Sequence, residues 1–195
     1  MKRWTVLAAL VVGCSSMSTG GWTTLIDGES GLENFAPIGD ANWRAEGGAI
    51  VADKGKGGNL VSKTSYRDFQ LRAEFWADHD TNSGIYIRCT DPKKVSSASA
   101  YEVNIYDRRP EPEYGTGAIV GVAKVSPMPK AGGRWNTYEI TAKGPRMTIV
   151  LNGVQTVSVS DGKFPEGPIA LQFANGPKNA PGGPIRWRKL QIRPL

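Results

Sequence analysis

The sequence predicts an all-β domain built as a two-sheet antiparallel sandwich. Apolar and polar residues alternate with a period of two in one segment after another, as in strands that have one buried face. No segment of ~12 residues or more keeps a helical period. The 24 Gly and 13 Pro residues of the 195-residue chain are spread out as turn formers. Many short strands without helices favour two packed sheets.

The first residues are expected to lie outside this domain. Lys2 and Arg3 precede an apolar run over residues 4–12, which is too short for a membrane span and typical of a signal peptide. Residues 11–14 (VVGC) resemble a bacterial lipobox, in which Cys14 is lipidated. We therefore expect a lipoprotein signal peptide at 1–13, a lipidated Cys and flexible tether at 14–21, and one sandwich domain at 22–195. Ordinary secretion with a free Cys14 remains the alternative.

The expected lipoprotein signal peptide implies a cellular location and limits the partners of the protein. The protein would be exported and held at the bacterial cell envelope, periplasmic or at the cell surface, touching the membrane through its lipid only. Cys89 would then have no disulfide partner. The formal net charge is +6, but most cations are scattered, so we expect no nucleic acid partner.

The first half of the domain is expected to contain five strands. Residues 43–51 and 59–62 would form an opening pair, joined by the Gly-rich loop 53–58. Residues 69–76, 84–88 and 101–107 alternate clearly. Their inward residues would be Phe69, Leu71, Ala73, Phe75, Ile85, Ile87, Tyr101, Val103 and Ile105.

The second half continues this pattern. Residues 138–142, 147–151 and 154–158 predict a meander, because Gly144-Pro145 and Asn152-Gly153 are strong turn signals. Residues 169–173 and 186–192 would be closing strands, with Gln172 facing outward. The connection over residues 108–134 is unusually long and rich in Pro and Gly, which is typical of a functional lid, although a plain surface loop is the alternative.

The outward faces of three strands carry side chains suited to sugars. They are Glu74, Trp76, Tyr86, Arg88, Glu102, Asn104 and Tyr106. Charged and amide groups hydrogen-bond sugar hydroxyls, and aromatic rings pack against the C–H face of a pyranose. This site requires the three strands to be neighbours in one sheet. Cross-strand pairs such as Glu74 with Arg88 are the simpler alternative.

Other chemistries have less support. His79 is the only His, so a His-rich zinc site and a Ser-His-Asp triad are disfavoured. Residues 78–80 (DHD) are a loose candidate for a divalent metal such as calcium or magnesium, so a metal cofactor stays open. The glycines of loop 53–58 match no phosphate-binding motif.

Short motifs along residues 22–195 resemble the 3-keto-disaccharide hydrolase family, whose domain is associated with 3-keto-glucoside lyase and hydratase chemistry. The matching stretches are residues 25–28 (LIDG), 66–69 (YRDF) with Leu71 and Glu74, 82–85 (NSGI) with Arg88, 101–103 (YEV) with Asp107, 116–118 (TGA), 135–136 (WN), 151–153 (LNG) and 171–172 (LQ). The resemblance implies a concanavalin A-like jelly roll and an exported protein acting on oxidised sugars.

The resemblance also implies a reaction. A carbonyl at C3 acidifies the C2 proton, so a base can remove it and expel the C1 substituent, after which water adds. Glu74 and Glu102 would be base or acid, Asp107 a third carboxylate, and Arg88 would offset developing negative charge. The substrate-binding residues would be Trp76, Asn82, Tyr86, Asn104, Tyr106 and Gln172. This chain has no His after residues 171–172, where many members carry one, which disfavours a His-dependent mechanism.

The sequence thus supports an exported enzyme that cleaves 3-keto-glycosides, and a carbohydrate or glycoside is the expected partner. A noncatalytic carbohydrate-binding module on the same fold is the main alternative, and a structural or adhesive surface protein is a third. An enzyme needs a carboxyl group with a shifted pKa in its cleft, whereas a binding module needs hydrogen bonds only.

Overall fold

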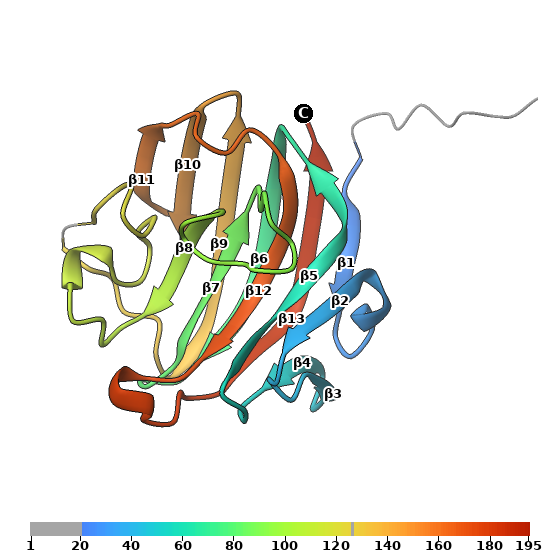
Figure 1. The fold of residues 1–195 in the computed structure, drawn as a ribbon, viewed down its shortest axis with the longest axis vertical. Helices are drawn as coiled ribbons and strands as arrows, with labels where there is room; N and C mark the ends of the chain where they lie inside the picture. Colours follow the sequence, from blue (N-terminus) through green and yellow to red (C-terminus); the bar gives the residue numbers. More distant parts are fainter. Residues whose placement is uncertain (1–20, 126) are drawn as a thin grey trace, which may run out of the picture.

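The computed structural model describes residues 21–125 and 127–195, which form two antiparallel β-sheets packed face to face (Figure 1). This confirms the predicted all-β sandwich. Cys14 and the expected signal peptide lie outside the described residues. In the described part, no helix is long and apolar enough to cross a membrane.

The larger sheet has eight strands in the order β11-β10-β9-β6-β13-β4-β3, with β1 also paired to β13. Its strands are β1 (Thr23–Asp27), β3 (Arg44–Glu46), β4 (Ala49–Ala52), β6 (Phe69–Ala77), β9 (Arg134–Lys143), β10 (Arg146–Leu151), β11 (Val154–Ser160) and β13 (Ile185–Pro194). β13 pairs with β6 along one side, and with β4 and β1 one after the other along its other side. It is therefore the strand that joins the two halves of this sheet.

The smaller sheet has five strands in the order β2-β5-β12-β7-β8. They are β2 (Phe35–Gly39), β5 (Gly57–Tyr66), β7 (Asn82–Ile87), β8 (Tyr101–Tyr106) and β12 (Gly167–Ala174). Three short 3-10 turns complete the elements, η1 (Leu32–Asn34), η2 (Pro112–Tyr114) and η3 (Pro177–Asn179). The smaller sheet is the one that carries the candidate site described below.

The main core lies between the two sheets. It contains every inward residue that the alternation predicts for residues 69–76, 84–88 and 101–107. Phe75 stacks on Tyr138 with ring centroids 5.1 Å apart and packs against the fully buried Trp187. Burial of these large rings accounts for much of the apolar area that stabilises the fold.

The predicted meander is confirmed, because β9, β10 and β11 pair in sequence order. Asn152 and Gly153 both have positive φ, 51° and 81°, as a two-residue hairpin turn requires. The strand expected over residues 43–51 is instead a hairpin of β3 and β4, because Gly47 and Gly48 turn the chain with φ of 59° and 77°.

Two predictions about which strands lie side by side in one sheet are wrong. Residues 43–51 and 59–62 do not pair, because β4 belongs to the larger sheet and β5 to the smaller one. The strands over 69–76, 84–88 and 101–107 do not share a sheet either. β7 and β8 pair with each other, whereas β6 lies in the opposite sheet between β9 and β13. The chain crosses between layers at both of these points.

Candidate functional site

Strand register aligns a polar cluster on the outer face of the smaller sheet. Tyr86 of β7 stands directly opposite Glu102 of β8 and opposite Ala170 of β12. In the next row, Gln172 pairs with Gly84, which pairs with Asn104. Because alternate residues of a strand share one face, the side chains of both rows project away from the core. The sequence places these residues on this face correctly.

Gly84 makes room at the centre of the cluster. A Cβ atom there would lie 2.9 Å from the Val103 carbonyl oxygen, and 3.6 Å from both Gln172 Oε1 and Glu102 Cγ. The side chains of Gln172 and Glu102 therefore approach each other over a residue that has no side chain. Gln172 Nε2 donates a hydrogen bond to the Tyr86 hydroxyl at 2.9 Å, which joins the two rows.

Glu102 is a buried carboxyl group, with 7% of its surface exposed. Burial raises its pKa above the ordinary value, and its interactions with Tyr86, Arg109 and Gln172 oppose part of that rise. Burial also raises the pKa of Tyr86, and the nearby Glu102 charge adds to this effect. The Tyr86 hydroxyl is therefore protonated at neutral pH, and Glu102 is a base of increased proton affinity.

Arg109, which the strand alternation does not predict, supplies positive charge at this cluster. It follows β8 in the long connection, and its charge acts on Glu102, Tyr86 and Tyr106. Its Nε is buried and lies 3.2 Å from Glu111 Oε2 without the geometry of a hydrogen bond. The adjacent pair Arg108-Arg109 was the only available signal, because alternation does not apply in a loop.

Three amide oxygens on this face are buried without a hydrogen-bond partner in the described part of the chain. They belong to Asn59, Gln172 and Asn104. Asn59 of β5 is the register partner of Gln172, so the three oxygens lie along one row across the sheet. A buried acceptor without a partner costs free energy. Donors from a polyhydroxylated ligand would satisfy these oxygens.

The face is partly covered by connections. The β7–β8 connection crosses the outer side of the smaller sheet (Figure 1) and packs Ala100 and Val95 with Val61, Tyr86 and Ala170 in a second apolar cluster. Asn104 Nδ2 donates to the Tyr114 carbonyl oxygen at 2.7 Å, so the long connection also lies over this face. Glu102 is thus largely enclosed by these connections.

The Asn82 end of the same face is more open. Asn82 is the register partner of Tyr106, and its Nδ2 donates to the Asn175 carbonyl oxygen at 2.7 Å. A cavity of about 300 Å³ lies at this end, lined by Tyr106, Arg108 and residues of the η3 loop. Asn82, Tyr86, Glu102, Asn104, Tyr106 and Gln172 therefore share one face, as predicted.

Glu74 and Trp76 do not join this cluster. They lie on β6, on the outer face of the larger sheet, where Glu74 accepts a hydrogen bond from Arg188 Nε at 2.6 Å. The Arg186 guanidinium lies over the Trp76 ring, 5.2 Å from its centroid. The expectation that these residues face Glu102 is wrong, because the whole core separates the two outer faces.

Arg88 also points elsewhere. Its φ is +56°, so it leaves the β7 alternation and turns into a buried position with 1% exposure. It donates to the carbonyl oxygens of Arg67 and Gly144 at 2.8 and 2.7 Å, and to Asp68 Oδ1 at 3.1 Å. Arg88 therefore clamps the end of β7 to the β5–β6 connection and to the β9–β10 turn of the larger sheet, instead of facing Glu102 as expected.

Asp107 holds the long connection at both ends. Its carboxylate accepts hydrogen bonds from Thr116 Oγ1 at 2.6 Å, Ala131 N at 3.0 Å and Gly132 N at 2.9 Å. The expected third carboxylate of the site is thus occupied by backbone and hydroxyl donors. Within residues 21–125 and 127–195, no group of three or more His, Cys, Asp or Glu side chains is arranged to hold a metal ion.

The family model of the 3-keto-alpha-glucoside-1,2-lyase-like domain matches residues 21–193. No match was found among curated proteins.

Solved structures share the fold. Two proteins of Parabacteroides distasonis named as candidate glycosyl hydrolases superpose with TM-scores of 0.73 and 0.74 at 26% and 18% identity. The alignments cover 90% of this chain in both cases, and 100% and 94% of the other chains. The carbohydrate binding module CBM66 of Bacillus subtilis superposes with a TM-score of 0.54 at 16% identity, covering 89% of this chain and 96% of that one. The lectin-type sandwich class predicted from the sequence is confirmed.

Proposed function

The chain belongs to the 3-keto-alpha-glucoside-1,2-lyase-like domain family, and we propose that it cleaves 3-keto-glycosides at the outer face of its smaller sheet, with Glu102 as the base. Membership in the family and the similarity to glycosyl hydrolase-like and carbohydrate-binding proteins support a carbohydrate-active domain. The substrate and the reaction are the parts that we propose.

The proposed step is an elimination. The Glu102 carboxylate takes the C2 proton, which the C3 carbonyl has acidified, and the C2–H electron pair moves into an enolate. The enolate then collapses, re-forming the C3 carbonyl and making the C1–C2 double bond as the C1–O bond breaks. The leaving oxygen takes the electron pair of that bond and the proton that Glu102 has taken up. Water adds to the resulting enone, so hydrolysis is the net result.

The burial of Glu102 is the observation that carries this proposal. A carboxylate of ordinary pKa is a weak base at neutral pH, and the raised pKa of Glu102 brings it closer to the working pH. Arg109 provides positive charge beside it, which would offset the negative charge of the enolate. The buried oxygens of Asn59, Gln172 and Asn104 would accept hydrogen bonds from sugar hydroxyls.

A noncatalytic carbohydrate-binding module is the second candidate. The resemblance to CBM66 favours it, and so does the row of amide oxygens, since these groups need hydroxyl donors but no reaction. Under this alternative, the Glu102 carboxylate would be one more acceptor for a sugar hydroxyl.

The experiment incubates the protein with a panel of 3-keto-glucosides and their unoxidised parents, and follows release of the C1 substituent. We expect release from the 3-keto compounds only, and a loss of at least ~100-fold in Glu102→Gln with sugar binding retained. Glu74→Gln is the matched control, because Glu74 lies on the other sheet, and it should keep full activity.

The same panel separates the two candidates. Binding without release of any substituent would reject the enzyme and leave the binding module. Full activity in Glu102→Gln would reject Glu102 as the base even if 3-keto-glycosides are cleaved.

A further inference from the structure

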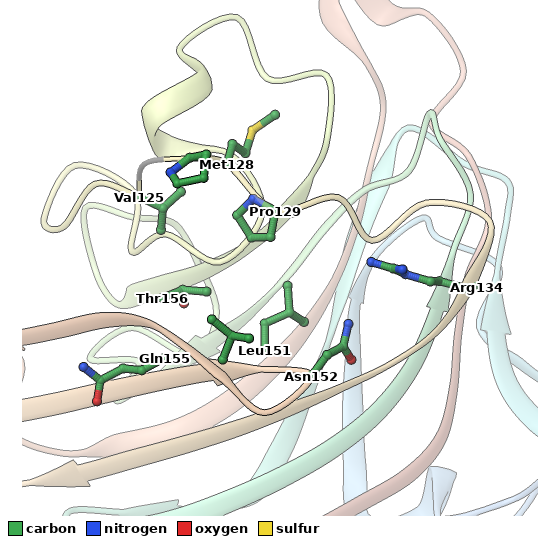
Figure 2. A pocket seen from close by; sticks show the side chains of 10 residues that line it. Val125, Met128, Pro129, Arg134, Leu151, Asn152, Gln155 and Thr156 are labelled. Carbon is green, nitrogen blue, oxygen red and sulfur yellow. The ribbon is translucent and has the colours of Figure 1, made fainter.

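A groove opens on the flank of the sandwich, between the β10–β11 hairpin and residues 127–129 of the long connection (Figure 2). Its volume is about 400 Å³, within the range of small-molecule sites in proteins. Its apolar lining consists of Val125, Pro127, Met128, Pro129, Leu151 and Val154. The Glu102 cluster lies on the outer face of the smaller sheet, so this groove is a separate site.

The walls of the groove are fixed in place. A side chain at Gly115 would collide with Met128 Sδ, so Met128 packs directly onto the backbone there. Gly117 has a φ of +90°, and a Cβ atom on it would lie 3.0 Å from Thr156 Cγ2. Thr156 Oγ1 donates to the Gly117 carbonyl oxygen at 2.7 Å, which ties β11 to the connection. The groove is thus lined by residues that pack on, or hydrogen-bond to, neighbouring elements.

The polar groups of the groove differ in how much of their hydrogen-bonding capacity is already used. Asn152 Oδ1 accepts from Thr137 N at 2.8 Å, and Asn152 Nδ2 donates to Asn136 Oδ1 at 2.9 Å. Both polar atoms of this amide therefore already form hydrogen bonds within the protein. Arg134 donates one hydrogen bond, from Nη2 to the Lys130 carbonyl oxygen, and forms no ion pair with an acidic residue in the described part of the chain. Figure 2 shows its guanidinium at one end of the groove, directed toward Leu151.

We propose that this groove binds a small amphipathic carboxylate. The carboxylate would pair with Arg134, which has planar donors suited to it. The apolar body would cover Met128, Leu151 and Val154, and Val154 has 67% of its surface exposed without such a ligand. An apolar wall with one unpaired cation at its end is complementary to this class of molecule, and the volume suits one or two rings.

The test uses naphthalene-2-carboxylate and the neutral naphthalene-2-methanol as probes, with binding to the full chain measured by calorimetry. We expect the carboxylate to bind more tightly than the alcohol. Arg134→Gln should weaken carboxylate binding about tenfold and leave alcohol binding unchanged. Val154→Glu should also weaken carboxylate binding relative to the parent protein, because it places a negative charge at the rim of the groove. Val154 is exposed, so this substitution does not disturb the core.

Two control variants sharpen the result. Arg146→Gln removes an exposed charge from β10 outside the groove and should leave both affinities unchanged. Glu102→Gln should also leave them unchanged, so failure of the sugar reaction and failure of this proposal are distinguishable.

Three outcomes would overturn the proposal. The first is no binding of either probe at millimolar concentration, and the second is equal carboxylate affinity in the Arg134→Gln protein. The third is a concentration-dependent dimer in sedimentation that Val154→Glu abolishes, since a second copy of the chain would then occupy the groove.

Discussion

Glu102 is the residue at which stability and function oppose each other. Its raised pKa means that the folded protein binds the Glu102 proton more tightly than the unfolded chain does. The ionised form that a base requires is therefore the form that burial disfavours. The acid limb of the activity profile should accordingly lie above 4.5, the ordinary pKa of this side chain.

Replacing Glu102 with Gln should stabilise the fold in a pH-dependent way. At pH 7 the variant should have a larger free energy of unfolding than the parent protein, because the charge is gone. The difference should vanish as the pH falls below 4.5, where Glu102 is protonated in both folded and unfolded states. Urea denaturation across this range measures it, and Glu139→Gln is the control, because it removes the charge of an exposed carboxylate instead of a buried one. If the free energy of unfolding of Glu102→Gln exceeded that of the parent protein by the same amount at every pH, burial of the Glu102 charge would not be its cause.

Arg88 should prove to be a structural residue. Arg88→Ala leaves the Arg67 and Gly144 carbonyl oxygens and the Asp68 carboxylate without their donor, so we expect a loss of about 3 kcal/mol in urea denaturation. Arg67→Ala is the comparison, because Arg67 forms an exposed pair with Glu166 at 2.8 Å and should cost under ~1 kcal/mol. Equal losses in the two variants would show that the buried clamp adds nothing.

Alternation predicted single residues well where a strand is regular. It placed Tyr86, Glu102 and Gln172 on one outer face, because each directly follows an inward-facing residue of its own strand. It failed at Arg88, where a positive φ ends the strand one residue early. It could not find Arg109, because a loop side chain is positioned by tertiary contacts that periodicity does not encode.

At the scale of elements, the long connection behaves as part of the smaller sheet. Val120 N donates to the Glu102 carbonyl oxygen at 3.0 Å, and Gly117 N donates to that of Asn104 at 3.1 Å, so the connection runs beside β8. Asp107 fixes the two ends of this segment. The predicted lid is thus held both at its base and along β8.

Asp107→Ala should loosen this connection. It removes the carboxylate that accepts from Thr116 Oγ1, Ala131 N and Gly132 N, so these donors lose that partner at a cost of about 2 kcal/mol. Hydrogen exchange at the Ala131 and Gly132 amides should speed up by roughly tenfold or more. Asp91→Ala, in an exposed turn where the carboxylate accepts from Lys93 N, should leave these two amides unchanged. Unaltered exchange at both amides would contradict the anchoring role.

Elements with strong local signals were predicted, and those with weak ones were not. The Asn152-Gly153 turn defines its hairpin by backbone conformation alone. In contrast, Gly47-Gly48 follows a stretch that continues to alternate, so the β3–β4 hairpin looks like one strand in the sequence. Local chemistry determines a turn, but it does not determine which distant strand will pair beside it.

At the scale of the whole molecule, the two outer faces have different chemistry. The larger sheet carries arginines stacked over tryptophans, as in Arg186 over Trp76 and Arg188 over Trp135, whereas the smaller sheet carries buried amides and a carboxyl group. The sequence could not predict that Trp76 lies on the larger sheet, because the points at which the chain crosses between the two sheets depend on long-range packing. Aromatic and polar residues with similar local patterns therefore ended up on opposite sides.

This asymmetry predicts which aromatic residue serves the proposed sugar site. Tyr86→Phe removes the hydroxyl that Gln172 contacts and should weaken sugar binding about tenfold. Trp76→Ala should leave sugar affinity unchanged, because its ring lies on the far sheet under Arg186. Titration of both variants with the same sugar gives the comparison, and a large effect of Trp76→Ala alone would move the site to the larger sheet.

The position of β13 constrains how the protein is made. Its partners β1, β4 and β6 all leave the ribosome before it does, and none of them can complete the centre of the larger sheet alone. Until residues 185–194 emerge, the flanks of these strands stay open to other chains, and such edges promote aggregation. The centre of the larger sheet is therefore completed only when residues 185–194 pair with β1, β4 and β6.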